Sequence, residues 1–222
     1  MTKDRLLHTE NLTIGYKGKT LATKLNIELF RGEFVGLKGL NGSGKTTLLR
    51  TLMGSLRPLS GHVFSGDTDI HRASEIQRAQ QLAIVLTDRV RLHGMTVKEL
   101  VELGRYPVEG VVHFGSSKDD HVVNLCLDKM RITHLANKSL NEISDGELQK
   151  TMIARALAQQ TPLILMDEPT AFLDYVARNE FYELMSALVR DSGISILFSS
   201  HDIDAMEKYA TRIIEIVVSD QG

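Results

Sequence analysis

The chain has 222 residues, and its 26 Lys and Arg against 28 Asp and Glu give a formal net charge of -2. This length suits one domain, with or without an inserted subdomain, and excludes two independent catalytic domains. The near-neutral charge gives no electrostatic reason to expect nucleic acid as a partner. Cys126 is the only cysteine, which excludes an intramolecular disulfide and makes a reducing cytoplasm the natural compartment.

The sequence offers no segment that would cross a membrane. Residues 1–5 mix charges and no long apolar run follows them, which argues against a secretory signal. The longest apolar stretches, at residues 163–166 and 216–218, are far shorter than the roughly 20 residues that a spanning helix needs. We therefore expect any membrane role to come through a partner.

Two kinds of strand pattern are present. Residues 12–16 and 25–29 alternate apolar and polar side chains between glycine turns, which predicts antiparallel strands. Residues 34–37, 163–166 and 194–198 are short, nearly continuous apolar runs, which are typical of parallel strands covered on both faces.

Helical patterns occupy two regions. Residues 46–53 have apolar side chains at helical spacing directly after a strand and a glycine-rich loop. Strand patterns then disappear from residue 88 to residue 160, where residues 97–103, 119–130 and 147–159 are predicted to be helices. The sequence therefore predicts an α/β core with a helical insertion.

The glycine-rich loop matches the phosphate-binding pattern GxxxxGK[ST] in full, between a strand and a helix as that pattern requires. Its residues are Gly39, Leu40, Asn41, Gly42, Ser43, Gly44, Lys45 and Thr46, and we add the next residue, Thr47, to the nucleotide-binding candidates. Glycines let backbone N–H groups converge on phosphate oxygens, Lys45 neutralises their charge, and the Thr46 hydroxyl can bind Mg²⁺. An ordinary glycine turn would not place all of these residues in register.

Two carboxylates end the apolar run at residues 163–166, where open α/β sheets bind ligands. Asp167 is a candidate ligand of Mg²⁺ through water, and Glu168 is a candidate general base for an attacking water. Taken alone, Asp167 and Glu168 could equally form a solvated acidic turn before Pro169. Next to a complete phosphate loop, the catalytic interpretation is favoured.

The sequence from Ile143 to Glu147, which reads ISDGE, resembles the Leu-Ser-Gly-Gly-Gln signature of ABC ATPases. The order of the motifs is also that of this family, and the resemblance extends from Tyr16 to His201. It implies a P-loop NTPase (RecA-like) core with an N-terminal antiparallel β subdomain and an inserted helical subdomain. The single domain would comprise a core of residues 1–87 and 161–222 and a helical subdomain of residues 88–160.

Ser144 and Glu147 also form an S-x-x-E capping box, which would start the following helix. The resemblance implies that the Ser144 hydroxyl and the Gly146 backbone face the γ-phosphate bound to the opposite subunit of a head-to-tail homodimer. Asp145 and Glu147 stand where the family usually has Gly and Gln, and we assign them no contact with nucleotide.

Three further residues gain a role from the resemblance. Asp174 would belong to the D-loop at the dimer interface, although it could simply be a turn before a helix. His201 would be the switch histidine that contacts the γ-phosphate, although a histidine at a strand end is more often structural. Tyr16 would stack on adenine, although an aromatic residue filling a small core is about equally plausible from the sequence alone.

Residues 94–100 and 104–107 resemble the helical subdomain of importers for iron siderophores, haem and cobalamin. The resemblance implies an ATPase that uses ATP and Mg²⁺, works with two integral membrane permease subunits, and serves a periplasmic or lipoprotein substrate-binding protein indirectly. It would lie at the cytoplasmic face of the inner membrane and bind no nucleic acid. A soluble non-transport ABC ATPase and a degenerate nucleotide-binding module stay open as alternatives.

One motif of the family is altered. Thr87 stands where ABC ATPases normally present a glutamine that reaches Mg²⁺. We expect Thr87 and Asp88 to replace that contact, with a water bridging to the metal.

Overall fold

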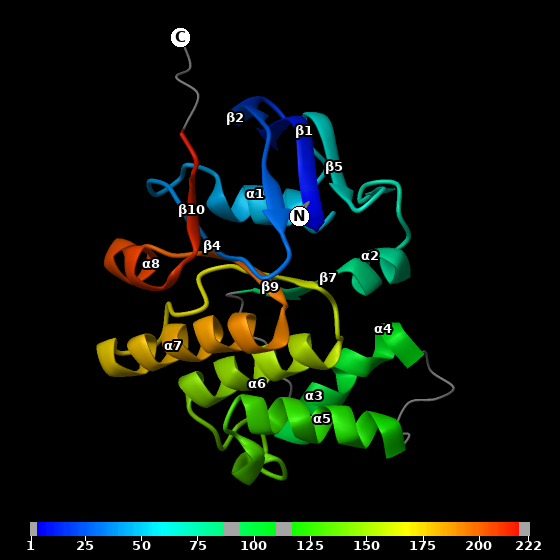
Figure 1. The fold of residues 1–222 in the computed structure, drawn as a ribbon, viewed down its shortest axis with the longest axis vertical. Coiled ribbons are helices and arrows are strands. Elements are labelled where there is room, and N and C mark those ends of the chain that lie inside the picture. The colour runs from blue at the N-terminus through cyan, green and yellow to red at the C-terminus, as the bar shows by residue number, and fades with distance from the viewer. Residues whose placement is uncertain (1–3, 87–93, 110–116, 218–222) are drawn as a thin grey trace.

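The computed structural model describes residues 4–86, 94–109 and 117–217, which form two sheets and a group of helices (Figure 1). The antiparallel sheet has the strand order β2-β1-β5-β6, and β3 pairs with the N-terminal part of β1. Its strands are β1 (Arg5–Tyr16), β2 (Lys19–Leu25), β3 (Glu28–Phe30), β5 (Ser60–Ser65) and β6 (Thr68–Asp69).

The second sheet is parallel throughout the described residues, with the order β10-β4-β9-β8-β7. Its strands are β4 (Phe34–Lys38), β7 (Leu82–Val85), β8 (Leu163–Met166), β9 (Ser195–Ser199) and β10 (Arg212–Glu215). The carboxyl ends of β4, β8 and β9 therefore meet at one edge of the sheet, which is where ligands bind in such folds.

The helices lie on both sides of the parallel sheet. They are α1 (Lys45–Leu52), α2 (Glu75–Gln81), α3 (Val97–Glu102), α4 (Tyr106–Glu109), α5 (Ser117–Lys129), α6 (Asp145–Ala158), α7 (Tyr175–Ser192) and α8 (Ile203–Tyr209), with short 3-10 turns at Leu103–Arg105 and Thr133–Leu135. Helix α1 lies between the two sheets, whereas α6 and α7 lie on the opposite side of the parallel sheet, with α3 and α5 beyond them (Figure 1).

Alternate side chains of the central strands enter different cores. On β8, Leu163 and Leu165 pack with α1 and the antiparallel sheet, whereas Ile164 and Met166 pack with α6 and α7. All four are fully buried. This two-sided burial explains the continuous apolar runs and confirms the parallel strands that they predict.

The α/β fold agrees with the sequence, and the elements described between β7 and β8 are all helices, as predicted, but one predicted strand is wrong. Residues 25–29 do not form a single strand, because β2 ends at Leu25 and β3 begins at Glu28. The break between them is a polar turn, in which the Asn26 side chain accepts a 2.8 Å hydrogen bond from the backbone N–H of Asn11. The Asn26 side chain also donates to the Lys24 carbonyl oxygen at 3.2 Å, and a local contact of this kind competes with the strand pattern.

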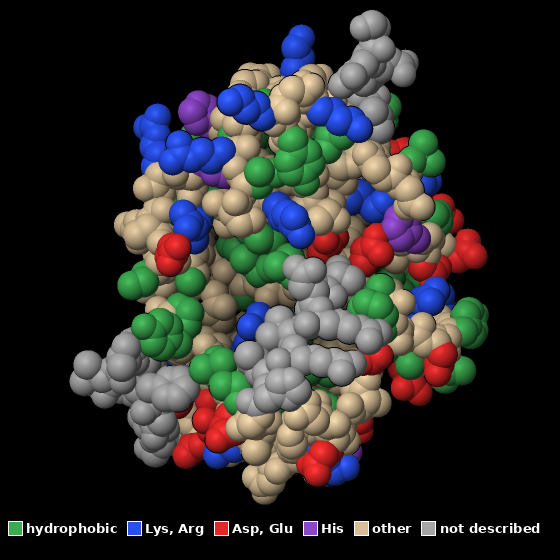
Figure 2. Space-filling view, turned by 180° about the vertical axis from the view of Figure 1, so that it is seen from behind, with side chains coloured by type: hydrophobic (Ala, Val, Ile, Leu, Met, Phe, Trp, Pro, Cys, Tyr) green, Lys and Arg blue, Asp and Glu red, His purple; other side chains and the backbone are tan. Residues whose placement is uncertain are grey.

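Charge is distributed unevenly on the face turned away from the viewer of Figure 1. Lys and Arg side chains are more numerous toward the end that carries the antiparallel sheet, and Asp and Glu toward the helical end (Figure 2). No helix among the described residues has the length and apolar character required to span a membrane.

Candidate active site

The loop that connects β4 to α1 is shaped by its glycines. Gly44 has a φ of 101°, a conformation that other residues rarely adopt. A Cβ on Gly39 would lie 2.4 Å from the Ser43 hydroxyl oxygen, so a side chain there would displace the loop. Helix α1 has no side-chain cap and no acidic residue in its first turn. Its first N–H groups and the positive end of its dipole are therefore available to an anion.

Lys45 and Thr46, the first residues of α1, connect this loop to its surroundings. The Lys45 side chain is buried, and its Nζ donates to the carbonyl oxygens of Gly39 at 2.8 Å and Leu40 at 3.3 Å. The Thr46 hydroxyl donates to Asp167 Oδ1 at 3.2 Å. The phosphate loop and the end of β8, 121 residues apart in sequence, are thus in direct contact.

Asp167 is positioned by a residue that the sequence did not single out. The Ser199 hydroxyl, fully buried at the end of β9, donates to Asp167 Oδ1 at 2.7 Å. The same hydroxyl oxygen accepts the backbone N–H of Glu168 at 2.9 Å. The available signal was the neighbouring apolar run of residues 194–198, whose carboxyl end must lie beside that of β8 in a parallel sheet.

Glu168 has an unusual backbone and a close partner. Its φ of 43° lies in the left-handed region, which is uncommon for a residue with a side chain and often marks a functional position. Its Oε1 lies 2.5 Å from Nε2 of His201. The carboxylate and the imidazole are therefore in direct contact.

These side chains border one cavity of about 450 Å³ beside the phosphate loop. The lining residues are Tyr16, Lys19, Leu21, Asn41, Gly42, Gly44, Lys45, Thr46, Thr47, Glu168 and His201. Tyr16 is half exposed, and its hydroxyl accepts a 3.2 Å hydrogen bond from Thr47. The structure thus brings the predicted residues Tyr16, Glu168 and His201 to the phosphate loop, and it adds Lys19 and Leu21, which carry no motif.

Not every predicted residue lines this cavity. Gly39, Leu40, Ser43 and Asp167 are absent from its lining, and so are Ser144, Gly146 and Asp174. Asp174 caps α7 by accepting the backbone N–H of Ala177 at 2.8 Å. The capping box of α6 is formed: Glu147 accepts from the Ser144 backbone N–H at 2.7 Å and from its hydroxyl at 2.8 Å, and these bonds lower the pKa of Glu147. Helix α6 begins at Asp145, two residues before the predicted start, because Ser144 is the cap.

The predicted replacement of the glutamine contact by Thr87 and Asp88 lies outside the described residues.

A phosphate loop between a strand and a helix, facing an Asp and a Glu at the end of a neighbouring parallel strand, defines a P-loop nucleoside triphosphatase. The family model for ABC transporters matches residues 22–171. The chain belongs to this family, as one of its ATP-binding, ATP-hydrolysing subunits.

Two relatives illustrate the branch of the family. The achromobactin transport ATP-binding protein of Dickeya dadantii is 37% identical over 208 residues, which cover 94% of this chain and 77% of the relative. The ferric enterobactin transport ATP-binding protein of Escherichia coli is 35% identical over 210 residues, covering 95% of this chain and 78% of the relative.

Solved structures give the same result. An inward-facing transporter assigned to the metal-chelate type superposes with a TM-score of 0.84 at 28% identity, covering 96% of this chain and 80% of that chain. A dimeric bacterial ABC transporter cassette superposes with a TM-score of 0.82 at 27% identity, covering 95% and 94% of the two chains.

Proposed function

We propose that this chain hydrolyses Mg-ATP as a head-to-tail dimer and thereby powers an importer for an iron chelate, haem or a similar chelate. One observation supports the catalytic part above all others: the phosphate loop and the Glu168–His201 pair converge on one cavity, and Asp167 contacts Thr46 of that loop, although these residues come from distant parts of the sequence.

Thr46 and Asp167 are the proposed Mg²⁺ ligands. Their oxygen atoms lie 3.2 Å apart, and a hydroxyl with one carboxylate is the small protein share that Mg²⁺ takes when phosphates and waters supply its other ligands. When bound there, the ion would supply positive charge that stabilises the negative charge developing during phosphoryl transfer.

The chain's own residues have distinct tasks. Lys45 and the N–H groups of the loop hold the β- and γ-phosphates, and Tyr16 offers a ring face to adenine. The Glu168 carboxylate orients the attacking water and accepts its proton. His201, held against Glu168 at 2.5 Å, keeps that carboxylate oriented and presents its ring to the γ-phosphate side of the cavity.

The dimer explains why Ser144, Gly146 and Asp174 lie away from the cavity of their own chain. In a head-to-tail arrangement, the start of α6 in one subunit would close the cavity of the other, with the Ser144 hydroxyl and Gly146 backbone toward the γ-phosphate. Asp174 would lie in the interface. The existence of a dimeric relative with a TM-score of 0.82 supports this arrangement.

The permease is expected to dock on a second cavity of about 390 Å³, where the proposed helical subdomain (88–160) meets the proposed core (1–87 and 161–222). Met53, Ile84, Leu103 and Pro107 provide apolar lining there, and Arg78 and Arg155 provide charge. An apolar cleft with charged residues is the kind of surface that receives a partner segment. Two permease subunits would hold this chain at the cytoplasmic face of the inner membrane, and the substrate-binding protein would act through them.

The cargo is inferred from the two transport relatives and from the resemblance at residues 94–100 and 104–107. Deletion of the gene should impair growth on a chelated iron or haem source and spare growth on sugars and amino acids. A deletion strain defective only in sugar or amino-acid uptake would overturn the cargo and leave the ATPase assignment intact.

A further inference from the structure

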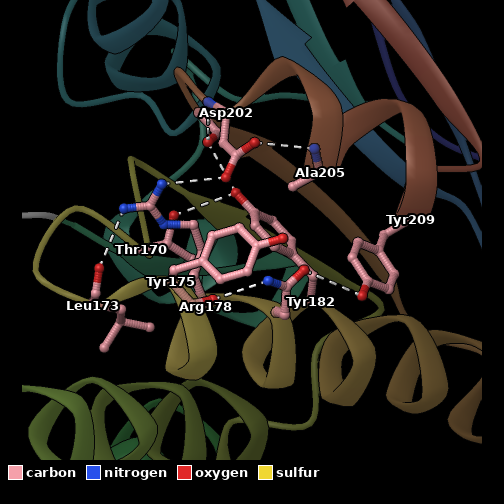
Figure 3. A network of polar contacts seen from close by, with 10 residues as sticks. Thr170, Leu173, Tyr175, Arg178, Tyr182, Asp202, Ala205 and Tyr209 are labelled. Carbon is pink, nitrogen blue, oxygen red and sulfur yellow. Dashed lines mark hydrogen bonds and ion pairs between the residues drawn. The ribbon is translucent and has the colours of Figure 1, made fainter.

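Two loops leave the parallel sheet beside the proposed active site. One follows β8 and runs from Asp167 to Asp174; the other follows β9 and contains Ser200, His201 and Asp202. A network of polar contacts joins them, in which side chains of α7 point toward both loops (Figure 3).

The first connection is made by Arg178 on α7. Its Nη1 lies 3.2 Å from Asp202 Oδ2, and its Nη2 donates to the Leu173 carbonyl oxygen at 3.2 Å. One guanidinium thus holds a backbone atom of the first loop and a carboxylate of the second. Its planar, forked geometry suits two simultaneous acceptors better than a lysine would.

The position of Arg178 is unfavourable for the helix itself. It lies near the N-terminus of α7, where the helix dipole disfavours a positive charge, and the first turn contains no acidic residue. Its Nε is buried without a hydrogen-bond partner among the described residues. The contacts of the Arg178 guanidinium with Leu173 and Asp202 therefore offset the free-energy cost of the helix dipole and of the unpartnered Nε.

The second connection is made by Tyr182, one turn further along α7. Its buried hydroxyl donates to Ser200 Oγ at 2.9 Å and lies 3.3 Å from Thr170 Oγ1. Burial raises the pKa of the Tyr182 hydroxyl, so it stays protonated and can act as the donor. Ser200 Oγ also accepts the backbone N–H of Asp202 at 3.0 Å.

The two connections hold the residues on either side of His201. Asp202 is fixed further because its Oδ1 accepts the Ala205 N–H at 3.0 Å and caps α8. The His201 side chain itself is 49% exposed, so burial does little to hold its ring at 2.5 Å from Glu168. Its placement must come largely from its anchored backbone.

We infer that Arg178 is a positioning residue, which ties the loop after β8 to the loop after β9 through Leu173 and Asp202 and so holds His201 against Glu168. The inference rests on the proposed roles of Glu168 and His201 in hydrolysis. Arg178 does not line the nucleotide cavity, so its loss should leave nucleotide binding in place.

The test compares Arg178→Met, Asp202→Asn and the double variant in the full chain. Asparagine still caps a helix, so Asp202→Asn removes the ion pair and little else. Each variant should lower kcat about tenfold to hundredfold, the effect of a misplacement of about 1 Å, and should keep KM for ATP within about twofold. The double variant should be no slower than the slower single variant, because both substitutions break the same contact, that between Arg178 and Asp202.

Arg190→Met, on an exposed arginine of the same helix, is the matched control and should keep wild-type kcat. A kcat within about twofold of wild type for Asp202→Asn would overturn the inference, even if Arg178→Met fails to fold. Additive losses in the double variant, or losses of kcat and ATP affinity in parallel with the melting temperature, would show a merely structural role and also overturn it.

Glu168→Gln and His201→Ala distinguish this result from failure of the proposed function. If both keep wild-type kcat, the catalytic assignment is wrong, and the inference fails with it. If both lose activity and the Arg178 and Asp202 variants do not, the inference alone is wrong.

Discussion

Asp167 accepts a 2.7 Å hydrogen bond from Ser199, whose oxygen in turn accepts the backbone N–H of the next residue, Glu168. One buried hydroxyl thus holds the Asp167 carboxylate and the Glu168 backbone. Ser199→Ala should lower the free energy of unfolding by about 1–3 kcal/mol, since it leaves a buried N–H without a partner, and should also slow ATP hydrolysis. Urea unfolding and steady-state ATPase assays measure the two effects.

Ser195 provides the control at the other end of the same strand. It is equally buried, accepts from Gly32 N–H at 2.8 Å and donates to the Phe30 carbonyl at 3.0 Å. Ser195→Ala should cost similar stability with hydrolysis preserved. Equal slowing of both variants would refute a specific role for Ser199.

Lys45→Ala should abolish nucleotide binding, because it removes the cation that the phosphate loop holds in place. Equilibrium titration with a fluorescent ATP analogue measures the affinity. Lys129→Ala, at a partly buried lysine that does not line the cavity, is the control. Unchanged affinity in Lys45→Ala would contradict the phosphate-loop assignment.

Glu168→Gln should still bind ATP but hydrolyse it roughly 10²–10⁴-fold more slowly, the usual contribution of a positioned general base. Slow turnover should also trap the ATP-bound dimer, which light scattering with Mg-ATP can detect at high protein concentration. A variant that hydrolyses ATP at the wild-type rate would exclude Glu168 as the base.

Glu147→Gln tests the altered signature. Glutamine can complete the capping box as glutamate does. It also removes a negative charge beside Ser144, the proposed γ-phosphate contact, so ATP-dependent dimerisation should become stronger. Sedimentation with Mg-ATP measures this. Weaker dimerisation in a folded Glu147→Gln variant would contradict a position near the phosphate.

The same substitution has a pH signature. The pKa of Glu147 is lowered from 4.5 by its bonds to Ser144, so the charged carboxylate stabilises the fold above about pH 4.5 and this contribution is lost as the pH falls. Glu147→Gln lacks this titration. Melting curves between pH 7 and pH 4 should therefore show a larger loss of stability in the wild type.

Arg105 forms a buried ion pair that links the helices. Its Nε lies 2.8 Å from Asp119 Oδ1, and its Nη1 donates to the Ala158 carbonyl at the end of α6. Arg105→Met should lower the free energy of unfolding by about 3–5 kcal/mol, because it removes one partner of a buried ion pair. Adding Asp119→Leu should restore part of the loss; no recovery would show that the ion pair itself is not the cause.

The sequence predicted the fold class because continuous apolar runs and a complete phosphate loop are local patterns. It could not predict Ser199, Lys19 or Arg178, because their roles depend on which strand ends and loops become neighbours. Thr46 and Asp167 were predicted to share one site, and their side chains are in direct contact. The motifs imply this contact, because each follows the carboxyl end of a strand in the same parallel sheet.

Boundaries were less accurate where side chains compete with the backbone. Strand β1 begins at Arg5 rather than Leu12, because the residues before Leu12 pair with β3 and β5, in addition to the pairing with β2 further along the strand. Its early part lacks a clean alternation, with Leu6 and Leu7 both buried. A strand with partners on both edges and a bend between them does not show the simple period of a half-exposed strand.

The backbone of Glu168 has a φ of 43°, an unfavourable conformation for a residue with a side chain. Such a residue costs about 1–3 kcal/mol, and glycine at the same place would relieve most of it. Selection for thermal stability alone would therefore favour glycine at this position and yield more stable proteins that no longer hydrolyse ATP. Engineering this subunit for stability must therefore leave Glu168 unchanged.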